Sequence, residues 1–206
     1  RPRTPLGRPG LVNPMKVGVL ALQGAFASHH AALTATGVNP TEVRTPQDLA
    51  DVDALVIPGG ESTTMLMLLD SSQIRTPLVE RIQNGLPVFG TCAGMILLST
   101  NMADGRPDQQ PLGLIDLDVR RNGYGRQIAS FEADLDINCL DHPFRGVFIR
   151  APLAERIGPK VEVLASVDGH GVLCQQENIL VSSFHPELTN DLRLHQLFVD
   201  RAFAAQ

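Results

Sequence analysis

PVFGTCAGMILLS, residues 87–99, is the stretch of this sequence that decides its fold class. Residues 87–89 form an apolar run that predicts a buried strand, and residues 95–99 predict a helix. Between them, residues 90–94 place a cysteine between two glycines, which is the thiol form of the nucleophile elbow of α/β proteins. Small neighbours permit the sharp turn, and amide N–H groups at the start of the helix favour the thiolate of Cys92. The stretch therefore predicts a reactive cysteine at the carboxyl edge of a parallel sheet.

The residues before this turn repeat the same alternation of strand and helix. Apolar runs predict strands over 16–22 and 54–57 and a short one at Val43, and the patterns between them predict helices over 25–36, 61–69 and 77–84. Fully apolar strands that alternate with helices are typical of a parallel sheet covered on both faces. We therefore expect an α/β fold with an open, mostly parallel, flavodoxin-like sheet.

The C-terminal half has a different pattern, with strands separated by loops and little helix. Strands are predicted over 114–121, 127–133, 147–150, 161–167, 172–175 and 179–184, with a hairpin turn at 168–171 and a closing helix over 194–202. Val161, Val163, Ala165 and Val167 alternate along one of these strands, which predicts that one of its faces is buried. We expect an antiparallel extension of the sheet.

The composition is that of a globular protein, and it disfavours a nucleic-acid or membrane protein. The 206 residues carry a net charge of −5 and no basic stripe, so a nucleic-acid partner is not expected. No apolar run is long enough for a membrane span, no signal peptide is visible, and three cysteines without metal-ligand spacing favour a reducing compartment. We expect a cytoplasmic protein without a metal or organic cofactor.

The first 14 residues, RPRTPLGRPGLVNP, differ from the rest. They hold four prolines and three arginines, a composition that packs no core. We expect residues 1–14 to be a flexible extension and residues 15–206 to form one domain.

A base for Cys92 is expected at His185, which follows the apolar strand over 179–184. In extended chain, residues i and i+2 point the same way, so Glu187 is predicted to orient the imidazole of His185. The other histidines (His29, His30, His142, His170 and His195) lack such a pattern and are expected at the surface or at helix caps. Cys92 could instead be a buried structural thiol, but its elbow context disfavours this.

Backbone hydrogen-bond donors are expected to accelerate amide hydrolysis more than ionisation of the cysteine does. Full ionisation of a cysteine raises its reactivity by roughly 30-fold at pH 7, whereas an oxyanion hole contributes about 100- to 1,000-fold. The N–H of Ala93, and that of Gly59 or Gly60, are the candidate donors.

Three motifs together resemble the class I glutamine amidotransferases: PGGESTT at 58–64, GTCAG at 90–94 and FHPE at 184–187. Four further segments resemble the glutaminase subunits of pyridoxal 5′-phosphate synthase, namely LQG at 22–24, RNGYGRQ at 121–127, SFE at 130–132 and VFIRAP at 147–152. Two positions depart from that family's usual pattern, Tyr124 in place of Phe and Ser28 in place of a Glu before His29.

The resemblance implies a catalytic triad of Cys92, His185 and Glu187 that hydrolyses L-glutamine. It also implies glutamine contacts from Gly60, Glu61, Ser62, Arg121, Ile149 and Arg150, and an oxyanion hole from Gly60 and Ala93. Ammonia is expected to pass to a barrel-shaped synthase subunit that makes the vitamin B6 cofactor, with the glutaminase poorly active until that subunit docks. On chemistry alone, Arg126 or Arg150 could pair with a carboxylate as well as Arg121 could.

Three other functions remain open at the level of the sequence. The first is the glutaminase subunit of another amidotransferase, such as that of imidazole glycerol phosphate synthesis, which the RNGYGRQ segment disfavours. The second is a stand-alone cysteine hydrolase that acts on γ-glutamyl conjugates. The third is a non-catalytic regulatory subunit, which the intact triad disfavours.

Overall fold

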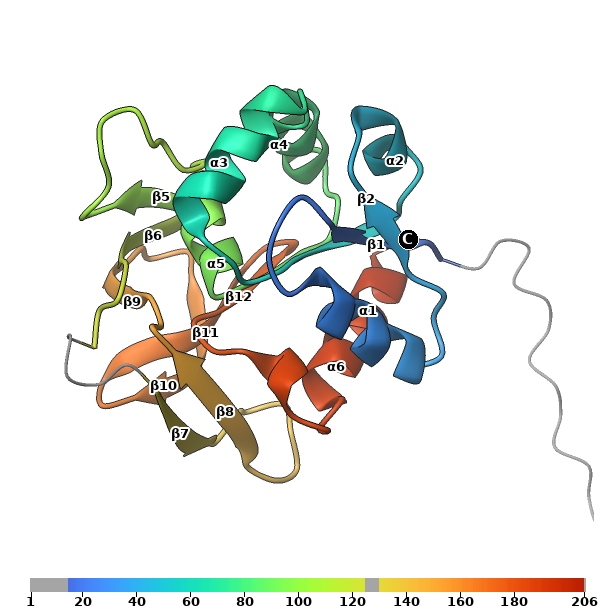
Figure 1. Cartoon of the computed structure of the whole chain (residues 1–206). Coiled ribbons are helices and arrows are strands. Elements are labelled where there is room, and N and C mark those ends of the chain that lie inside the picture. The colour runs from blue at the N-terminus through green and yellow to red at the C-terminus, as the bar shows by residue number, and fades with distance from the viewer. Residues whose placement is uncertain (1–14, 125–129, 206) are drawn as a thin grey trace, which may run out of the picture.

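A seven-stranded sheet forms the centre of the computed structural model, which describes residues 15–124 and 130–205 (Figure 1). Its order is β10-β11-β12-β4-β3-β1-β2. The strands are β1 (Val17–Leu20), β2 (Thr41–Val43), β3 (Ala54–Ile57), β4 (Val88–Thr91), β10 (Glu162–Val167), β11 (His170–Gln176) and β12 (Ile179–Ser182). Five neighbouring strands of the sheet pair in parallel, namely β2, β1, β3, β4 and β12. The strands β11 and β10 then continue the sheet with antiparallel pairing. The expected fold class is confirmed.

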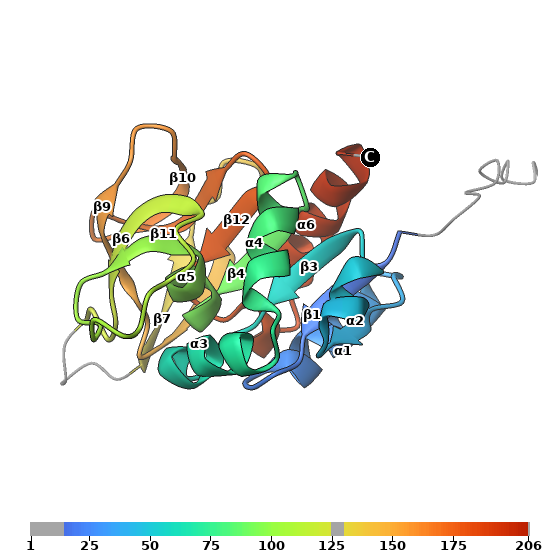
Figure 2. The same ribbon diagram turned by 90° about the horizontal axis from the view of Figure 1, so that it is seen from above.

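Helices cover both faces of this sheet, as Figure 2 shows for α4 and α6. They are α1 (Phe26–Ala35), α2 (Pro46–Ala50), α3 (Ser62–Ser71), α4 (Arg75–Gln83), α5 (Ala93–Leu98) and α6 (Arg193–Ala204), with a 3₁₀ turn η1 (Pro186–Leu188). In β3, Leu55 and Ile57 pack in the core beneath α2 to α5, whereas Ala54 and Val56 pack in the core beneath α1 and α6. Burial on both faces explains why β3 is apolar throughout.

Two small sheets flank the carboxyl end of the central sheet (Figure 1). One is formed by β5 (Ser99–Met102), β6 (Ile115–Arg120) and β9 (Leu153–Ile157), and the other by β7 (Ser130–Leu135) and β8 (Phe144–Ile149). Phe131 and Phe148 stack across β7 and β8 with ring centroids 4.4 Å apart. Together the small sheets support the loops that carry residues 121–124 and 149–150.

The structure corrects some sequence expectations. The helix α2 and the strands β5 and β9 were not predicted, because each is short and two of them pair only with distant segments. The predicted strand over 127–133 is observed from Ser130, and residues 127–129 lie outside the described residues, as does the expected extension over 1–14.

The regular alternation predicted for 161–167 is wrong in its second half. A bulge between Val163 and Ala165 shifts the register of β10 against β11. Val161 and Val163 therefore pack against one core layer, whereas Ala165 and Val167 pack against the other. A slip of one residue moves every following side chain to the opposite face of a sheet.

Candidate active site

Cys92 lies at the tight turn between β4 and α5. Its φ is +51°, a backbone region that costs residues other than glycine about 1–3 kcal/mol. The N–H of Cys92 donates to the Ser182 carbonyl at 2.8 Å, which ties the turn to β12. A Cβ on Gly94 would lie 2.3 Å from the Ile57 carbonyl oxygen, and one on Gly90 would lie 2.8 Å from the Gly94 backbone. The glycines of the elbow are therefore required by close packing.

His185 and Glu187 meet beside this turn. The His185 N–H donates to the Val147 carbonyl at 2.8 Å, which fixes the end of the strand segment against β8. Nδ1 of His185 lies 2.7 Å from Oε1 of Glu187, and Cys92 lies close enough to raise the pKa of the ring. The contact with Glu187 is reached through the 3₁₀ turn η1 rather than through the extended chain we expected. The structure thus brings Cys92, His185 and Glu187 together, with the hydrogen bond between His185 and Glu187 formed.

The surroundings of His185 favour its charged form. Burial opposes protonation, but the neighbouring Cys92 and Glu187 outweigh it and raise the pKa of His185 to about 10. Burial also acts against ionisation of Glu187, yet the hydrogen bond from His185 and the nearby His29 keep the pKa of this carboxyl below its ordinary value. At neutral pH the imidazole of His185 is therefore charged beside the carboxylate of Glu187.

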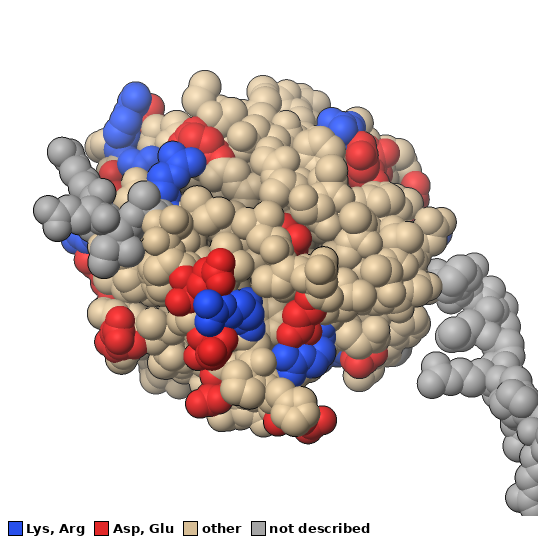
Figure 3. All heavy atoms as spheres, turned by 60° about the horizontal axis from the view of Figure 1, so that its bottom comes forward, with Lys and Arg blue, Asp and Glu red and all other residues tan. Residues whose placement is uncertain are grey.

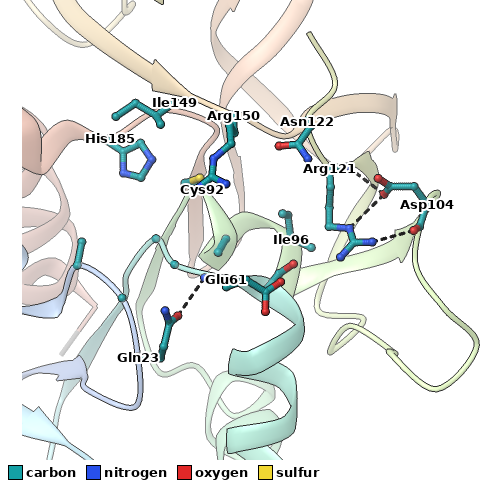
Figure 4. A pocket seen from close by; sticks show the side chains of 16 residues that line it. Gln23, Glu61, Cys92, Ile96, Asp104, Arg121, Asn122, Ile149, Arg150 and His185 are labelled. Carbon is teal, nitrogen blue, oxygen red and sulfur yellow. Dashed lines mark hydrogen bonds and ion pairs between the residues drawn. The ribbon is translucent and has the colours of Figure 1, made fainter. Parts of the chain in front are cut away.

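A cavity of about 560 Å³ opens over Cys92 at the carboxyl ends of β1, β3 and β4 (Figure 4). It is lined by residues 23–25 and 59–62, by Cys92, Ala93, Ile96 and Asp104, and by Arg121, Asn122, Ile149, Arg150 and His185. Open parallel sheets bind their ligands at this edge. A buried cysteine paired with a charged imidazole in such a cavity can attack an acyl or amide carbon.

A model of the SNO glutamine amidotransferase family matches residues 19–204. This chain belongs to the SNO glutamine amidotransferase family. Pyridoxal 5′-phosphate synthase subunit PdxT of Mycobacteroides abscessus is 56% identical over 89% of this chain and 95% of its own length. The PdxT subunit of Pelotomaculum thermopropionicum is 54% identical over 93% of this chain and 97% of its own length.

Solved structures agree with this family membership. The crystal structure of a glutamine amidotransferase has a TM-score of 0.87 at 47% identity, and covers 91% of this chain and 98% of that one. PurLQS of Thermotoga maritima has a TM-score of 0.62 at 16% identity, covering 93% of this chain and 96% of that one, and shares the fold alone.

The residues that the family resemblance assigns to glutamine all lie in this cavity, but their side chains differ in availability. The carboxylate of Glu61 accepts from the N–H groups of Thr63 and Thr64 at 3.1 and 2.7 Å, so it caps α3. Ser62 is the first residue of α3 and is buried. The side chain of Glu61 thus caps α3, and its backbone N–H donates to Oε1 of Gln23 at 3.0 Å.

The two arginines of the cavity are held differently. Arg121 donates to Thr63 Oγ1 at 3.1 Å and to the Asp104 carbonyl at 3.0 Å. Arg150 has a φ of +44° and extends toward Cys92 in Figure 4, and no hydrogen bond or ion pair of its guanidinium occurs within the described parts of the chain. Ile149 is 37% exposed at the rim. Arg126, the third candidate for a carboxylate, lies outside the described residues.

The peptide between Gly59 and Gly60 has a defined orientation. The Gly59 carbonyl accepts from the Ala25 N–H at 3.0 Å, so the N–H of Gly60 points away from Ala25. A Cβ on Gly59 would lie 2.7 Å from the His185 ring and 3.3 Å from Cys92 Cβ, so only glycine fits beside the triad. The first amide of α5, that of Ala93, follows the thiol directly. The oxyanion roles of Gly60 and Ala93 stay predictions.

Two histidines that the sequence assigned to the surface are in the core, and that prediction is wrong for them. His29 on α1 and His195 on α6 are each 0% exposed, whereas His142 is exposed. The signal was present, because His195 lies one residue after Leu194 and three before Phe198, on the apolar face of α6. A polar residue on a buried helix face needs a hydrogen-bond partner, and that partner can lie far away in the sequence.

The described part of the chain offers neither a metal-binding cluster nor a membrane-spanning helix. No cluster of three or more His, Cys, Asp or Glu residues there could hold a metal ion. Among these residues, no helix combines the length and apolarity that a membrane crossing requires. On the face shown in Figure 3, acidic side chains lie next to basic ones. Among the ion pairs of the described residues, Arg145 pairs with both Glu132 and Asp134.

Proposed function

We propose that this chain is the glutaminase subunit of a pyridoxal 5′-phosphate synthase. It hydrolyses L-glutamine through Cys92, His185 and Glu187 and delivers ammonia to a barrel-shaped synthase subunit. The observation that carries the glutaminase step is that Cys92 and His185 line one cavity and that His185 is hydrogen-bonded to Glu187 behind it. The observation that supports the destination of ammonia is the name of the relatives that match nearly the whole chain.

The reaction begins with Cys92 as its thiolate, and the imidazole of His185 holds the proton. The thiolate attacks the side-chain amide carbon of glutamine. The N–H groups of Gly60 and Ala93 hold the oxyanion that forms.

The imidazolium of His185 then gives its proton to the leaving nitrogen, and ammonia departs. A γ-glutamyl thioester on Cys92 remains. Water, deprotonated by neutral His185, hydrolyses this thioester to glutamate and restores the thiolate–imidazolium pair. Glu187 orients the ring in both half-reactions and stabilises its charge.

Substrate selection is assigned to the cavity rim. The guanidinium of Arg150 extends into the cavity, where it meets the α-carboxylate of glutamine, and the groups around Gly60, Glu61 and Ser62 receive the amide end. Arg121, braced by Asp104 and Thr63, shapes the opposite wall. Ile149 is exposed at the rim and contributes apolar contact to the methylene groups of the substrate.

The test is isotope transfer in the assembled complex. The chain and its synthase subunit receive glutamine labelled with ¹⁵N in the side-chain amide, a pentose phosphate, a triose phosphate and excess unlabelled ammonium. The proposal predicts product enriched in ¹⁵N despite the unlabelled pool, because ammonia passes directly between subunits. Labelled ammonia in solution with unlabelled product would indicate a stand-alone hydrolase, and no release of ammonia at all would refute the glutaminase step.

The matched control is Cys139→Ser, since Cys139 is exposed and outside the cavity. It is expected to leave the isotope transfer unchanged. Asparagine, one methylene shorter, is expected to release little ammonia.

A further inference from the structure

Behind Glu187, two buried histidines, His29 and His195, extend the row of polar side chains into the core. Nε2 of His29 lies 3.3 Å from Oε2 of Glu187 and 3.0 Å from Oγ1 of Thr91. Nδ1 of His29 lies 2.9 Å from Nε2 of His195. The side chains of His29 and Glu187 are both fully buried, and His195 is 0% exposed. The row therefore joins η1 to α1 and α6.

The hydrogen positions in this row follow from the groups at its ends. Oε2 of Glu187 is a buried carboxylate oxygen without a hydrogen bond of ordinary geometry among the described residues. Nε2 of His29 lies close to both Oε2 and Thr91 Oγ1, and a hydrogen on Nε2 would point at these two oxygens, so we assign the hydrogen of His29 to Nε2. Nδ1 of His29 must then accept, so His195 donates from its own Nε2.

The opposite assignment leaves a buried donor without a partner. If His29 carried its hydrogen on Nδ1, its Nε2 could accept from the Thr91 hydroxyl but would turn a lone pair toward the carboxylate of Glu187. His195 would then carry its hydrogen on Nδ1, an atom that has no partner among the described residues. A buried donor without an acceptor is costly, whereas an acceptor nitrogen left empty costs less.

We propose that His29 and His195 are positioning residues that hold the carboxylate of Glu187 ionised and aimed at His185, so that the active-site imidazole stays charged. This inference rests on the triad proposed above. Neutral histidines suit the task because they supply N–H dipoles without adding a charge that would compete with His185 for the carboxylate.

The surroundings keep both histidines neutral. Burial lowers the pKa of His29, with the charge of Glu187 opposing and that of His185 assisting. Burial lowers the pKa of His195 to about 3, and His29 assists. The titratable groups that face Glu187 are His185 on one side and His29 on the other. Across the neutral range, therefore, only His185 in this row carries positive charge.

The test compares two substitutions of His29. His29→Gln keeps an N–H donor close to the position of Nε2, and His29→Phe keeps a ring without any donor. His30→Gln and His30→Phe are matched controls, because His30 is the next residue of α1 and is partly exposed. All variants are made with Cys139→Ser, so that Cys92 is the reactive thiol to be followed; Cys174 is buried and its pKa is raised to about 12.

The readout is the rate at which iodoacetamide alkylates Cys92, measured by peptide mass between pH 4 and pH 9 in the free chain. This rate reports the ionisation of Cys92 beside His185 and needs no turnover of glutamine. It therefore tests the positioning role of His29 and His195 separately from the proposed glutaminase activity. For His29→Phe we expect the rate at pH 6 to fall about tenfold and its acidic midpoint to move to higher pH. Loss of a donor raises the pKa of Glu187, and its neutral form no longer stabilises the imidazolium.

For His29→Gln we expect an alkylation profile within about threefold of the parent, because the donor is kept. In the complex, His29→Phe should lower kcat for glutamine by about ten- to a hundredfold with little change in KM. Equal profiles for His29→Phe and the His30 variants, in chains with native circular dichroism, would overturn the proposal. So would equal losses for His29→Phe and His29→Gln.

A second measurement needs no variant and holds even if His29→Phe does not fold. Nitrogen NMR of the ¹⁵N-histidine-labelled chain is expected to show His29 and His195 as neutral Nε2–H tautomers at pH 7. An Nδ1–H tautomer or a charged ring at His29 would overturn the proposed positioning role.

Discussion

The imidazole of His185 donates from Nδ1 to the Glu187 carboxylate over 2.7 Å, although the two residues are separated by one proline. The 3₁₀ turn that begins at Pro186 folds Glu187 back beneath the ring. Proline fixes φ at this position, so the acceptor is placed by the backbone before any substrate arrives. The orientation of the base is thus built into five consecutive residues, from Ser183 to Glu187.

Glu187→Gln is expected to lower kcat for glutamine by on the order of 100- to 10,000-fold, because a neutral amide neither fixes the tautomer of His185 nor stabilises its charge. Ammonia release by the complex measures this. Glu80→Gln is the control, since Glu80 is exposed on α4. An unchanged kcat for Glu187→Gln would remove Glu187 from the triad.

Stability should depend on pH through His185. Its pKa rises from 6.5 in the unfolded chain to about 10 in the folded one, so the folded state holds the extra proton between these values. The stabilisation is fully present below pH 6.5 and is lost as pH rises toward 10. Urea unfolding of the native chain and of His185→Gln measures it. The difference in unfolding free energy between them should shrink across this window, and a difference that grows would contradict the assignment.

Gly94→Ala should destabilise the chain, because the new Cβ would lie 2.3 Å from the Ile57 carbonyl oxygen. Backbone must move to relieve this contact, at a cost of about 1–3 kcal/mol in unfolding free energy. Gly105→Ala is the matched control, since the nearest atom there is the flexible end of Met102. Chemical denaturation compares the two variants, and equal costs would show that the elbow is not tightly packed.

Arg150→Ala is expected to raise KM for glutamine by about ten- to a hundredfold with little change in kcat, because a charged hydrogen bond contributes about 1.5–3 kcal/mol to binding. Arg106→Ala is the control, since Arg106 is exposed and pairs with Asp108. Steady-state kinetics of the complex measures both constants. A fall in kcat with constant KM would instead indicate that Arg150 acts in the transition state.

Local patterns in the sequence were sufficient for the elbow and for the parallel half of the sheet. Four of these strands, β1, β3, β4 and β12, are fully buried and short, and the glycines around Cys92 mark a tight turn within five residues. The base His185 was also predicted, though the reason offered, an extended chain, was wrong, since a 3₁₀ turn brings Glu187 to it.

The remaining features depend on contacts between distant segments. His29 and His195 are 166 residues apart in the sequence, and their role becomes visible only when the fold brings their side chains into contact. The bulge in β10 is set by pairing with β11, and β9 exists because it pairs with β6. Glu61 was expected to contact the substrate, and the sequence did not show that two amides of α3 occupy its carboxylate.

Ammonia release from glutamine by the complex of this chain with its synthase subunit tests the central claim most directly, with Cys92→Ala beside the native chain and Cys139→Ser as the control. The account predicts that Cys92→Ala still binds the synthase subunit but releases no ammonia above background, while Cys139→Ser releases it at the native rate. Turnover that survives in Cys92→Ala would contradict the assignment of the nucleophile.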